Sequence, residues 1–103
     1  QENIAGELVI AEKKIMQKFF DVLAKTPSMA SYGKKDVLEK VKMGAADIVL
    51  ISENIDDGVY EDFEIVCGEF GTEVKAISVD TREGKQLMNL GGFAAILRYS
   101  VSE

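Results

Sequence analysis

Apolar residues recur at helical spacing near the start of the chain. Steps of three and four positions bring five of them onto one face of a predicted helix: Leu8, Ala11, Ile15, Phe19 and Val22. A flanking stripe widens this face, and it comprises Met16, Phe20 and Leu23. Charged and amide residues fill the other side, and Pro27 ends the pattern. The sequence therefore predicts a long amphipathic helix that packs on a core.

Four short apolar runs predict strands further along the chain, over residues 28–32, 48–51, 74–79 and 93–97. The second run is Ile48-Val49-Leu50-Ile51, which is unbroken and mostly β-branched. Such a run is typical of a strand that is covered on both faces, as in a parallel sheet.

Two shorter amphipathic helices are predicted between these strands. The first covers residues 36–43 and precedes Gly44, a residue type that favours the end of a helix. The second is capped by Asp56 or Asp57 and ends at Gly71. Its apolar face recurs with helical spacing at Val59, Phe63, Val66 and Phe70.

A fourth helix is predicted through Leu90, because Asp80 followed by Glu83 resembles a capping box. Gly91 and Gly92 end this helix and lead into the last strand. Helices and strands thus alternate with short connections, which implies an α/β fold with parallel neighbours in the sheet and helices on both of its faces. A length of 103 residues allows a single domain.

The composition excludes several classes of function. The chain has 12 basic and 18 acidic residues, and its net charge of −6 disfavours binding to nucleic acid or to an anionic membrane surface. It has no histidine and one cysteine, which leaves no histidine-based site, no cysteine zinc site and no internal disulfide. No apolar run approaches the roughly 20 residues that cross a bilayer, and no signal peptide opens the chain. We therefore expect a cytoplasmic domain that does not bind membranes.

The remaining candidate groups favour structural roles. Cys67 adjoins the apolar stripe of the segment 59–70, where a free cysteine usually acts as a small core residue. The acidic residues of that segment match a solvated helix face, and they are Glu61, Asp62, Glu64 and Glu69. Because no nucleophile, base and oxyanion donors form a recognisable arrangement, we expect no catalytic site, no metal and no cofactor.

One short basic stretch keeps an RNA-binding alternative open. Gly33 precedes the start of a predicted helix, and Lys34 and Lys35 follow it. Backbone N–H groups and two cations at such a start can bind phosphate, and lysine is unfavourable there for the helix dipole. A solvated first turn explains the same residues, and the negative net charge favours that interpretation.

Four stretches together resemble one known family: AEKKIMQKFF, ASYGKKDVLEKVKMGAADIVLISE, DTREGKQL and LGGFAAILRY. They are similar to the C-terminal domain of archaeal and eukaryotic class-1 peptide chain release factors, and the resemblance spans Ala11 to Tyr99. It implies one domain over residues 1–103. The implied fold is an αβα sandwich with a four-stranded mixed sheet, similar to that of kink-turn-binding ribosomal proteins.

The chain departs from related families at defined positions. The rescue factor Pelota typically has a histidine where this chain has Thr81, and kink-turn binders usually show Gly-x-Asn-Glu where residues 33–36 are GKKD. Release factors often carry an insertion after the strand that ends in LISE, so an insertion is either lacking or omitted near residues 54–58. The family's Gly-Gly-Gln loop belongs to an upstream domain, so the chain resembles an excised fragment.

The resemblance implies an adaptor rather than an enzyme. In this family the C-terminal domain docks a translational GTPase during stop-codon-directed termination, either the elongation-factor-1-alpha homologue of archaea or the class-2 release factor of eukaryotes. Through the full-length protein it also meets the ribosome and the recycling ATPase, while peptidyl-tRNA hydrolysis belongs to another domain. Two alternatives remain open, a Pelota-type ribosome-rescue domain and a kink-turn RNA-binding domain.

We expect the partner to bind at the exposed edge of the first helix together with the closing strand. Lys14 and Lys18 would supply charge complementarity and Phe20 an apolar anchor. Arg98 and Tyr99 are of residue types that are enriched at interfaces. The structural alternative is that Phe20 belongs to the core and Arg98 is a solvated strand end. We expect no strong direct binding of nucleic acid by this surface.

Overall fold

The computed structural model describes the backbone of residues 4–99 and the side chains of residues 13–99. The predicted alternation of helices and strands is confirmed over this range, while the side chains of Leu8 and Ala11 lie outside it. In chain order the elements are α1 (Ile4–Lys25), the 3-10 helix η1 (Pro27–Met29), β1 (Ala30–Tyr32), α2 (Lys34–Lys42), β2 (Ala46–Ser52), α3 (Asp57–Glu69), β3 (Glu73–Ile77), α4 (Arg82–Asn89) and β4 (Phe93–Leu97).

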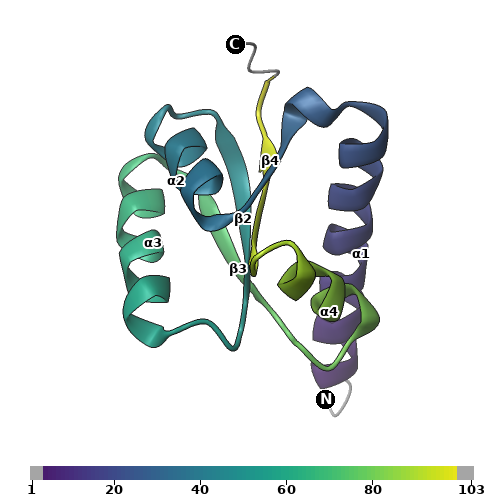
Figure 1. The fold of residues 1–103 in the computed structure, drawn as a ribbon. Coiled ribbons are helices and arrows are strands. Elements are labelled where there is room, and N and C mark those ends of the chain that lie inside the picture. The colour runs from purple at the N-terminus through teal and green to yellow at the C-terminus, as the bar shows by residue number, and fades with distance from the viewer. Residues whose placement is uncertain (1–3, 100–103) are drawn as a thin grey trace.

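The four strands form one mixed sheet, as the family resemblance implies, and their order in the sheet is β1-β4-β2-β3. The sequence pattern predicted that neighbouring strands run parallel. Among the described strands only β2 and β3 do so, because β4 runs antiparallel to both β1 and β2. The reason is the position of α4, which stays at the end of the sheet where β3 finishes (Figure 1). From there β4 starts back along the sheet in the opposite direction.

Two helical layers enclose the sheet, with α1 and α4 on one face and α2 and α3 on the other (Figure 1). Alternate residues of β2 serve the two layers, as the pleat of a strand requires. Val49 and Ile51 belong to the core beneath α2 and α3, and Ile48 and Leu50 to the core beneath α1 and α4. The unbroken apolar run of β2 is therefore explained by burial on both faces, as its pattern predicts.

The first helix packs through a stripe that is slightly rotated from the predicted one. Met16 and Phe19 are completely buried, whereas Ile15 and Val22 are only partly covered. Met16 comes from the flanking stripe, one turn before Phe20. The centre of the buried face thus lies between the two predicted stripes, which explains why both are apolar.

The apolar face of α3 is also rotated from its prediction. Phe63 and Cys67, one turn apart, are its fully buried residues, and the Phe63 ring stacks on Phe93 with 4.8 Å between ring centroids. Burial raises the pKa of the Cys67 thiol to about 11, so this thiol stays protonated near neutral pH. Cys67 is therefore a core residue, as expected. Phe70, predicted for the buried face, follows the last helical residue and is 39% exposed.

Caps were predicted at the starts of α3 and α4. Both helices are capped by a short polar side chain, but the cap of α4 lies one residue later than predicted. Asp56 caps α3 as predicted and accepts from the Gly58 N–H at 3.1 Å. The predicted capping box of Asp80 and Glu83 is wrong, because Thr81 caps α4. Its hydroxyl accepts from the Gly84 N–H at 2.9 Å and can donate to the Ser78 carbonyl at 3.3 Å.

Gly84 lies where α4 presses against the preceding turn. A Cβ atom added at this position would lie 1.8 Å from the Ser78 carbonyl oxygen, so the site excludes every side chain unless the backbone shifts. We predict that Gly84→Ala lowers the free energy of unfolding by about 2–3 kcal/mol, measured by urea denaturation.

Gly68 provides the matched control for this substitution. It lies within α3 and is exposed, and a Cβ atom there would meet nothing within 4 Å. Because alanine is the better helix former, Gly68→Ala should raise the free energy of unfolding by up to about 1 kcal/mol. Equal effects of the two substitutions would contradict the close contact at Gly84.

Candidate functional site

The two lysines predicted to meet a partner share the solvent face of α1. Lys14 and Lys18 are one turn apart and exposed, and neither has an ion-pair partner among the described residues. Asp21 follows on the same side, but it is engaged by Lys25 at 3.2 Å. The lysine pair therefore presents an unneutralised positive strip to solvent.

Phe20 lies on a different flank of α1. Helical spacing groups it with Lys13 and Gln17 rather than with Lys14 and Lys18. Phe20 is half-buried and packs against the core under α1, with its ring edge-on to that of Phe19 and 5.3 Å between centroids. It is partly a core residue and partly open to solvent, so the predicted helix edge divides into a charged strip and a separate, half-apolar flank.

Arg98 ties the end of β4 to two other elements. Its Nε donates to the Ala46 carbonyl at 3.0 Å, and its Nη2 donates to the carbonyls of Phe70 at 3.2 Å and Gly71 at 2.9 Å. A cation is favourable at the carbonyl end of a helix, where the last turn of α3 lacks internal partners. Arg98 therefore differs from a solvated strand end, since its guanidinium holds α3, β2 and β4 together.

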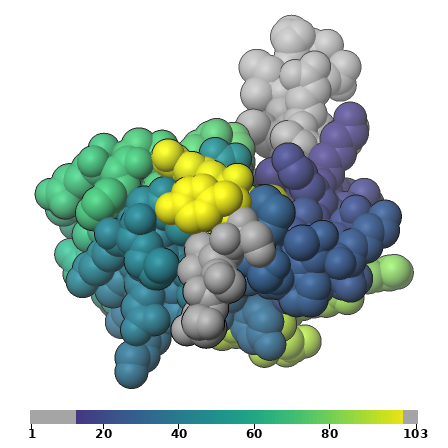
Figure 2. Space-filling model, turned by 90° about the horizontal axis from the view of Figure 1, so that it is seen from above, coloured from purple at the N-terminus to yellow at the C-terminus, as the bar shows by residue number. Residues whose placement is uncertain are grey.

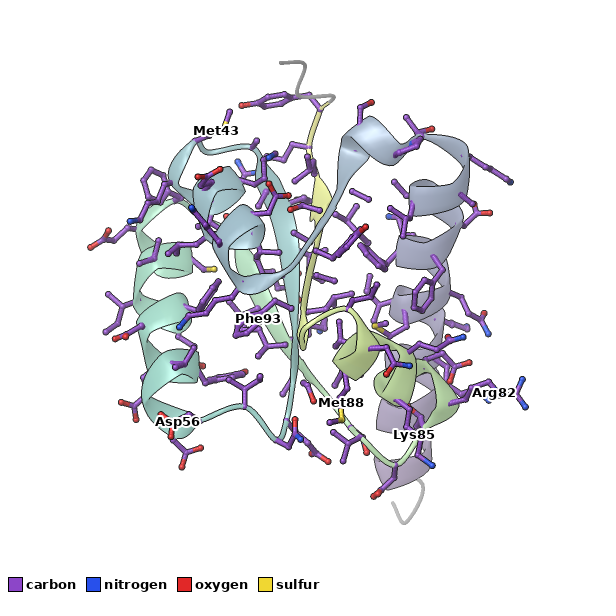
Figure 3. All side chains as sticks on the ribbon, in the orientation of Figure 1. Met43, Asp56, Arg82, Lys85, Met88 and Phe93 are labelled. Carbon is purple, nitrogen blue, oxygen red and sulfur yellow. The ribbon has the colours of Figure 1, made fainter. Side chains whose placement is uncertain are left out.

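Large apolar side chains gather around this junction. Tyr99 is 51% exposed and Met43 is 55% exposed, and the partly exposed Phe70 caps the end of α3. The Arg98 N–H donates to the Ala45 carbonyl at 2.7 Å, which brings the turn after α2 beside the end of β4. Figure 2 looks onto this end and shows the residues after β4 (yellow) beside α3 (green), and Figure 3 shows Met43 at the end opposite Asp56 and Lys85.

Sequence reasoning missed Met43 and misplaced Phe70. Both continue an amphipathic helix by one residue and stand directly before a glycine with positive φ, Gly44 at 75° and Gly71 at 70°. A residue in this position leaves the helical register, so its apolar side chain no longer follows the buried stripe. The glycine that follows each helix could have indicated in the sequence that Met43 and Phe70 lie outside the buried stripe.

The basic stretch at the start of α2 does not have the geometry of a phosphate-binding site. The Gly33 N–H donates to the Phe93 carbonyl at 3.0 Å, so this N–H serves the fold. Lys34 and Lys35 are exposed. Asp36, in the first turn, accepts from the Ser31 hydroxyl and from Lys40 Nζ. The hydrogen bond from Ser31, aided by Lys40, holds the pKa of the Asp36 carboxyl below its ordinary value of 3.8.

A cavity of about 450 Å³ lies between α1 and the start of α4, and it is lined by Lys13, Gln17, Thr81, Arg82 and Glu83. Within the part of the chain that the structure describes, no three or more acidic or cysteine side chains are grouped so as to hold a metal ion. None of the described helices is long and apolar enough to cross a membrane. Among the described residues, the open surfaces lie at the end of the sheet around Tyr99 and Met43 and between α1 and α4.

Comparisons with known proteins identify the class. The family model described as eRF1 domain 3 matches residues 9–101, and the chain belongs to this family of release-factor domains. It is 31% identical to peptide chain release factor subunit 1 of Methanobrevibacter smithii, over 90% of this chain and 34% of the relative. The crystal structure of the archaeal translation termination factor aRF1 is 30% identical and superposes with a TM-score of 0.80, over 93% of this chain and 28% of that one.

Pelota proteins are similar as well. The Pelota homologue of Methanothermobacter thermautotrophicus is 34% identical, over 97% of this chain and 29% of the relative. The chain thus spans about a third of the length of the curated relatives it matches. The alignment with the release factor extends over 138 residues and that with Pelota over 104, so the release factor contains a stretch that this chain lacks. Here β2 and α3 are joined by residues 53–56 alone.

The contacts of Arg98 generate a test of its structural role. Arg98→Ala removes three hydrogen bonds to backbone carbonyls. We predict a loss of about 1–3 kcal/mol in the free energy of unfolding, measured by urea denaturation. Tyr99→Ala, at the exposed neighbour, should change it by less than about 0.5 kcal/mol. A stable Arg98→Ala variant would contradict the assignment.

The lowered pKa of Asp36 predicts a pH-dependent contribution to stability. Because the carboxyl is more acidic when folded, its contribution is present above the ordinary pKa of 3.8 and is lost as pH falls through the lower folded value. The carboxylate is half-exposed, so Asp36→Asn should cost less than about 1 kcal/mol at neutral pH. Urea denaturation should show this difference vanishing in acid, and a pH-independent difference would contradict it.

Proposed function

We propose that this chain is the GTPase-docking module of a class-1 release factor that acts in stop-codon-directed translation termination. The observation that carries the proposal is the match to eRF1 domain 3 along residues 9–101. The partner is a translational GTPase, the elongation-factor-1-alpha homologue in an archaeal setting or a class-2 release factor in a eukaryotic one. Through the rest of the protein, the module meets the ribosome and the recycling ATPase in the cytoplasm.

The chemistry of termination belongs to another part of the full-length factor in this proposal. The acidic side chains of α3 lie along an exposed helix face, and the thiol of Cys67 is buried and protonated. Neither offers a nucleophile or a paired acid and base to a substrate. The module contributes binding energy and position, while peptidyl-tRNA hydrolysis takes place in a separate domain.

The proposed docking surface has three parts: the positive strip of Lys14 and Lys18, the half-apolar flank of α1 that carries Phe20, and the exposed Tyr99 after β4. Charged residues that are free of internal partners steer association, and exposed aromatic side chains supply most of the binding energy once contact is made. Arg98 has a different part in this surface. Its guanidinium donates to the carbonyls of Ala46 in β2 and of Phe70 and Gly71 after α3, so its charge is already engaged within the fold.

A Pelota-type rescue function is the second candidate. It is favoured by the alignment with Pelota, which covers 97% of this chain without a long unmatched stretch. Against it stands Thr81, which occupies the position where Pelota proteins typically carry histidine and here caps α4. The upstream sequence separates the two, since a Gly-Gly-Gln loop supports termination and its absence supports rescue. An RNA-binding function is disfavoured because the Gly33 N–H is already bonded within the fold.

We predict that the double variant Lys14→Glu, Lys18→Glu weakens binding to the GTP-bound elongation-factor-1-alpha homologue by roughly tenfold, and that Tyr99→Ala weakens it several-fold. Isothermal titration calorimetry on the chain measures both effects. The loss should shrink at high salt, because exposed charges are screened.

The double variant Lys34→Glu, Lys35→Glu is the matched control, since it makes the same charge change at exposed positions on the opposite layer. It should bind like the unaltered chain. Equal losses in both double variants would refute the assigned surface. Absence of binding by the unaltered chain and by its full-length factor would refute the function.

A further inference from the structure

The cavity between α1 and α4 brings together residues that lie far apart in the sequence. Lys13 and Gln17 come from consecutive turns of α1, and Thr81, Arg82 and Glu83 come from the start of α4. Figure 3 shows Arg82 extending from the start of α4 past α1. A volume of about 450 Å³ is within the range of sites that hold a small ligand or a few residues of a peptide.

The polar groups of this cavity are largely unused by the fold. Among the described residues, the side chains of Lys13, Gln17, Arg82 and Glu83 have no ion-pair or hydrogen-bond partner. Thr81 is the exception, because its hydroxyl is engaged with Ser78 and Gly84. The Thr81 hydroxyl thus already caps the start of α4, and the side chains of the other lining residues are available to a ligand.

The cavity carries charge of the opposite sign to the molecule. Among the lining residues that the structure describes, Lys13 and Arg82 outweigh Glu83, so this part of the lining is cationic, while the chain as a whole has a net charge of −6. Two unpaired cations facing the same space repel each other, and a bound anion relieves this repulsion. The guanidinium of Arg82 also has the planar fork that fits a carboxylate with two parallel hydrogen bonds.

We propose that this cavity receives an acidic side chain from the protein partner that docks on α1. The proposal rests on the proposed docking function and names the chemistry of one of its contacts. The carboxylate lies between Lys13 and Arg82, and Glu83 accepts an N–H of the same peptide segment. Phe20 shares the flank of α1 that carries Lys13 and Gln17, so the acidic anchor and an apolar contact lie side by side.

Protein carboxylate fits this cavity better than an RNA phosphate. A nucleic acid brings a row of negative charges past a chain whose net charge is −6, which opposes binding outside the cavity. Glu83 stands beside the two cations, and it repels a phosphate chain while offering an acceptor to a peptide N–H. A single acidic side chain gains from the cations and meets only this one opposing charge.

Binding to the GTP-bound elongation-factor-1-alpha homologue, measured by calorimetry, tests the proposal within the docking function. Lys13→Glu and Arg82→Glu should each weaken binding by roughly tenfold or more, while Arg82→Lys should retain most of it. Lys42→Glu makes the same charge change at an exposed residue of α2, on the opposite layer, and should bind like the unaltered chain. If the unaltered chain binds and the cavity variants bind equally well, the cavity assignment is wrong and the docking function stands.

A second measurement keeps the cavity testable if that GTPase does not bind at all. The isotopically labelled chain is titrated with the peptide acetyl-Asp-Glu-Asp-amide and observed by NMR. Amide signals of residues 81–83 and of Lys13 and Gln17 should shift, and the shifts should be absent with acetyl-Asn-Gln-Asn-amide and in Arg82→Glu. No shift at millimolar peptide overturns the proposal. A single-stranded RNA that shifts the same signals at lower concentration overturns it in favour of phosphate.

Discussion

The fold depends on one strand that is buried on both sides. Ile48 and Leu50 contact the layer of α1 and α4, and Val49 and Ile51 contact the layer of α2 and α3. Burying those side chains contributes to the stability of both layers at once, because buried apolar area contributes roughly 25 cal/mol per Å². The neighbours β3 and β4 complete the backbone hydrogen bonds of β2, which has no other way to satisfy them inside the molecule.

Because the interior is apolar on both sides of the sheet, the polar chemistry lies at the margins. Arg98 uses its guanidinium to close the end of the sheet where three elements finish, and the cavity between α1 and α4 leaves Lys13 and Arg82 open. At the cavity this arrangement agrees with the docking function proposed above, since the rigid interior positions side chains there that the fold itself does not use. Membership of the eRF1 domain 3 family agrees with it.

Local patterns in the sequence predicted most elements, because each depends on neighbours a few residues away. The strand 93–97 has the predicted bounds, and Asp56 caps α3 as expected. Three features that the local patterns did not predict depend on residues far apart in the sequence. They are the antiparallel direction of β4, the carbonyls that accept from Arg98, and the placement of Lys13 and Arg82 around one cavity. Residues Met43 and Phe70 were missed for a local reason, since a helix that ends one residue early turns its next apolar side chain outward.

Because the sheet separates the two hydrophobic cores, amino-acid substitutions in one core can accumulate independently of substitutions in the other. Met16 lies in one core and Phe63 in the other, with the sheet between them, so substitutions at such pairs should have additive effects on stability. One helical layer can therefore drift to suit a new binding partner while the other preserves the folded state. A domain with this fold can therefore change the binding surface of one helical layer while it keeps the same sheet and the same opposite layer.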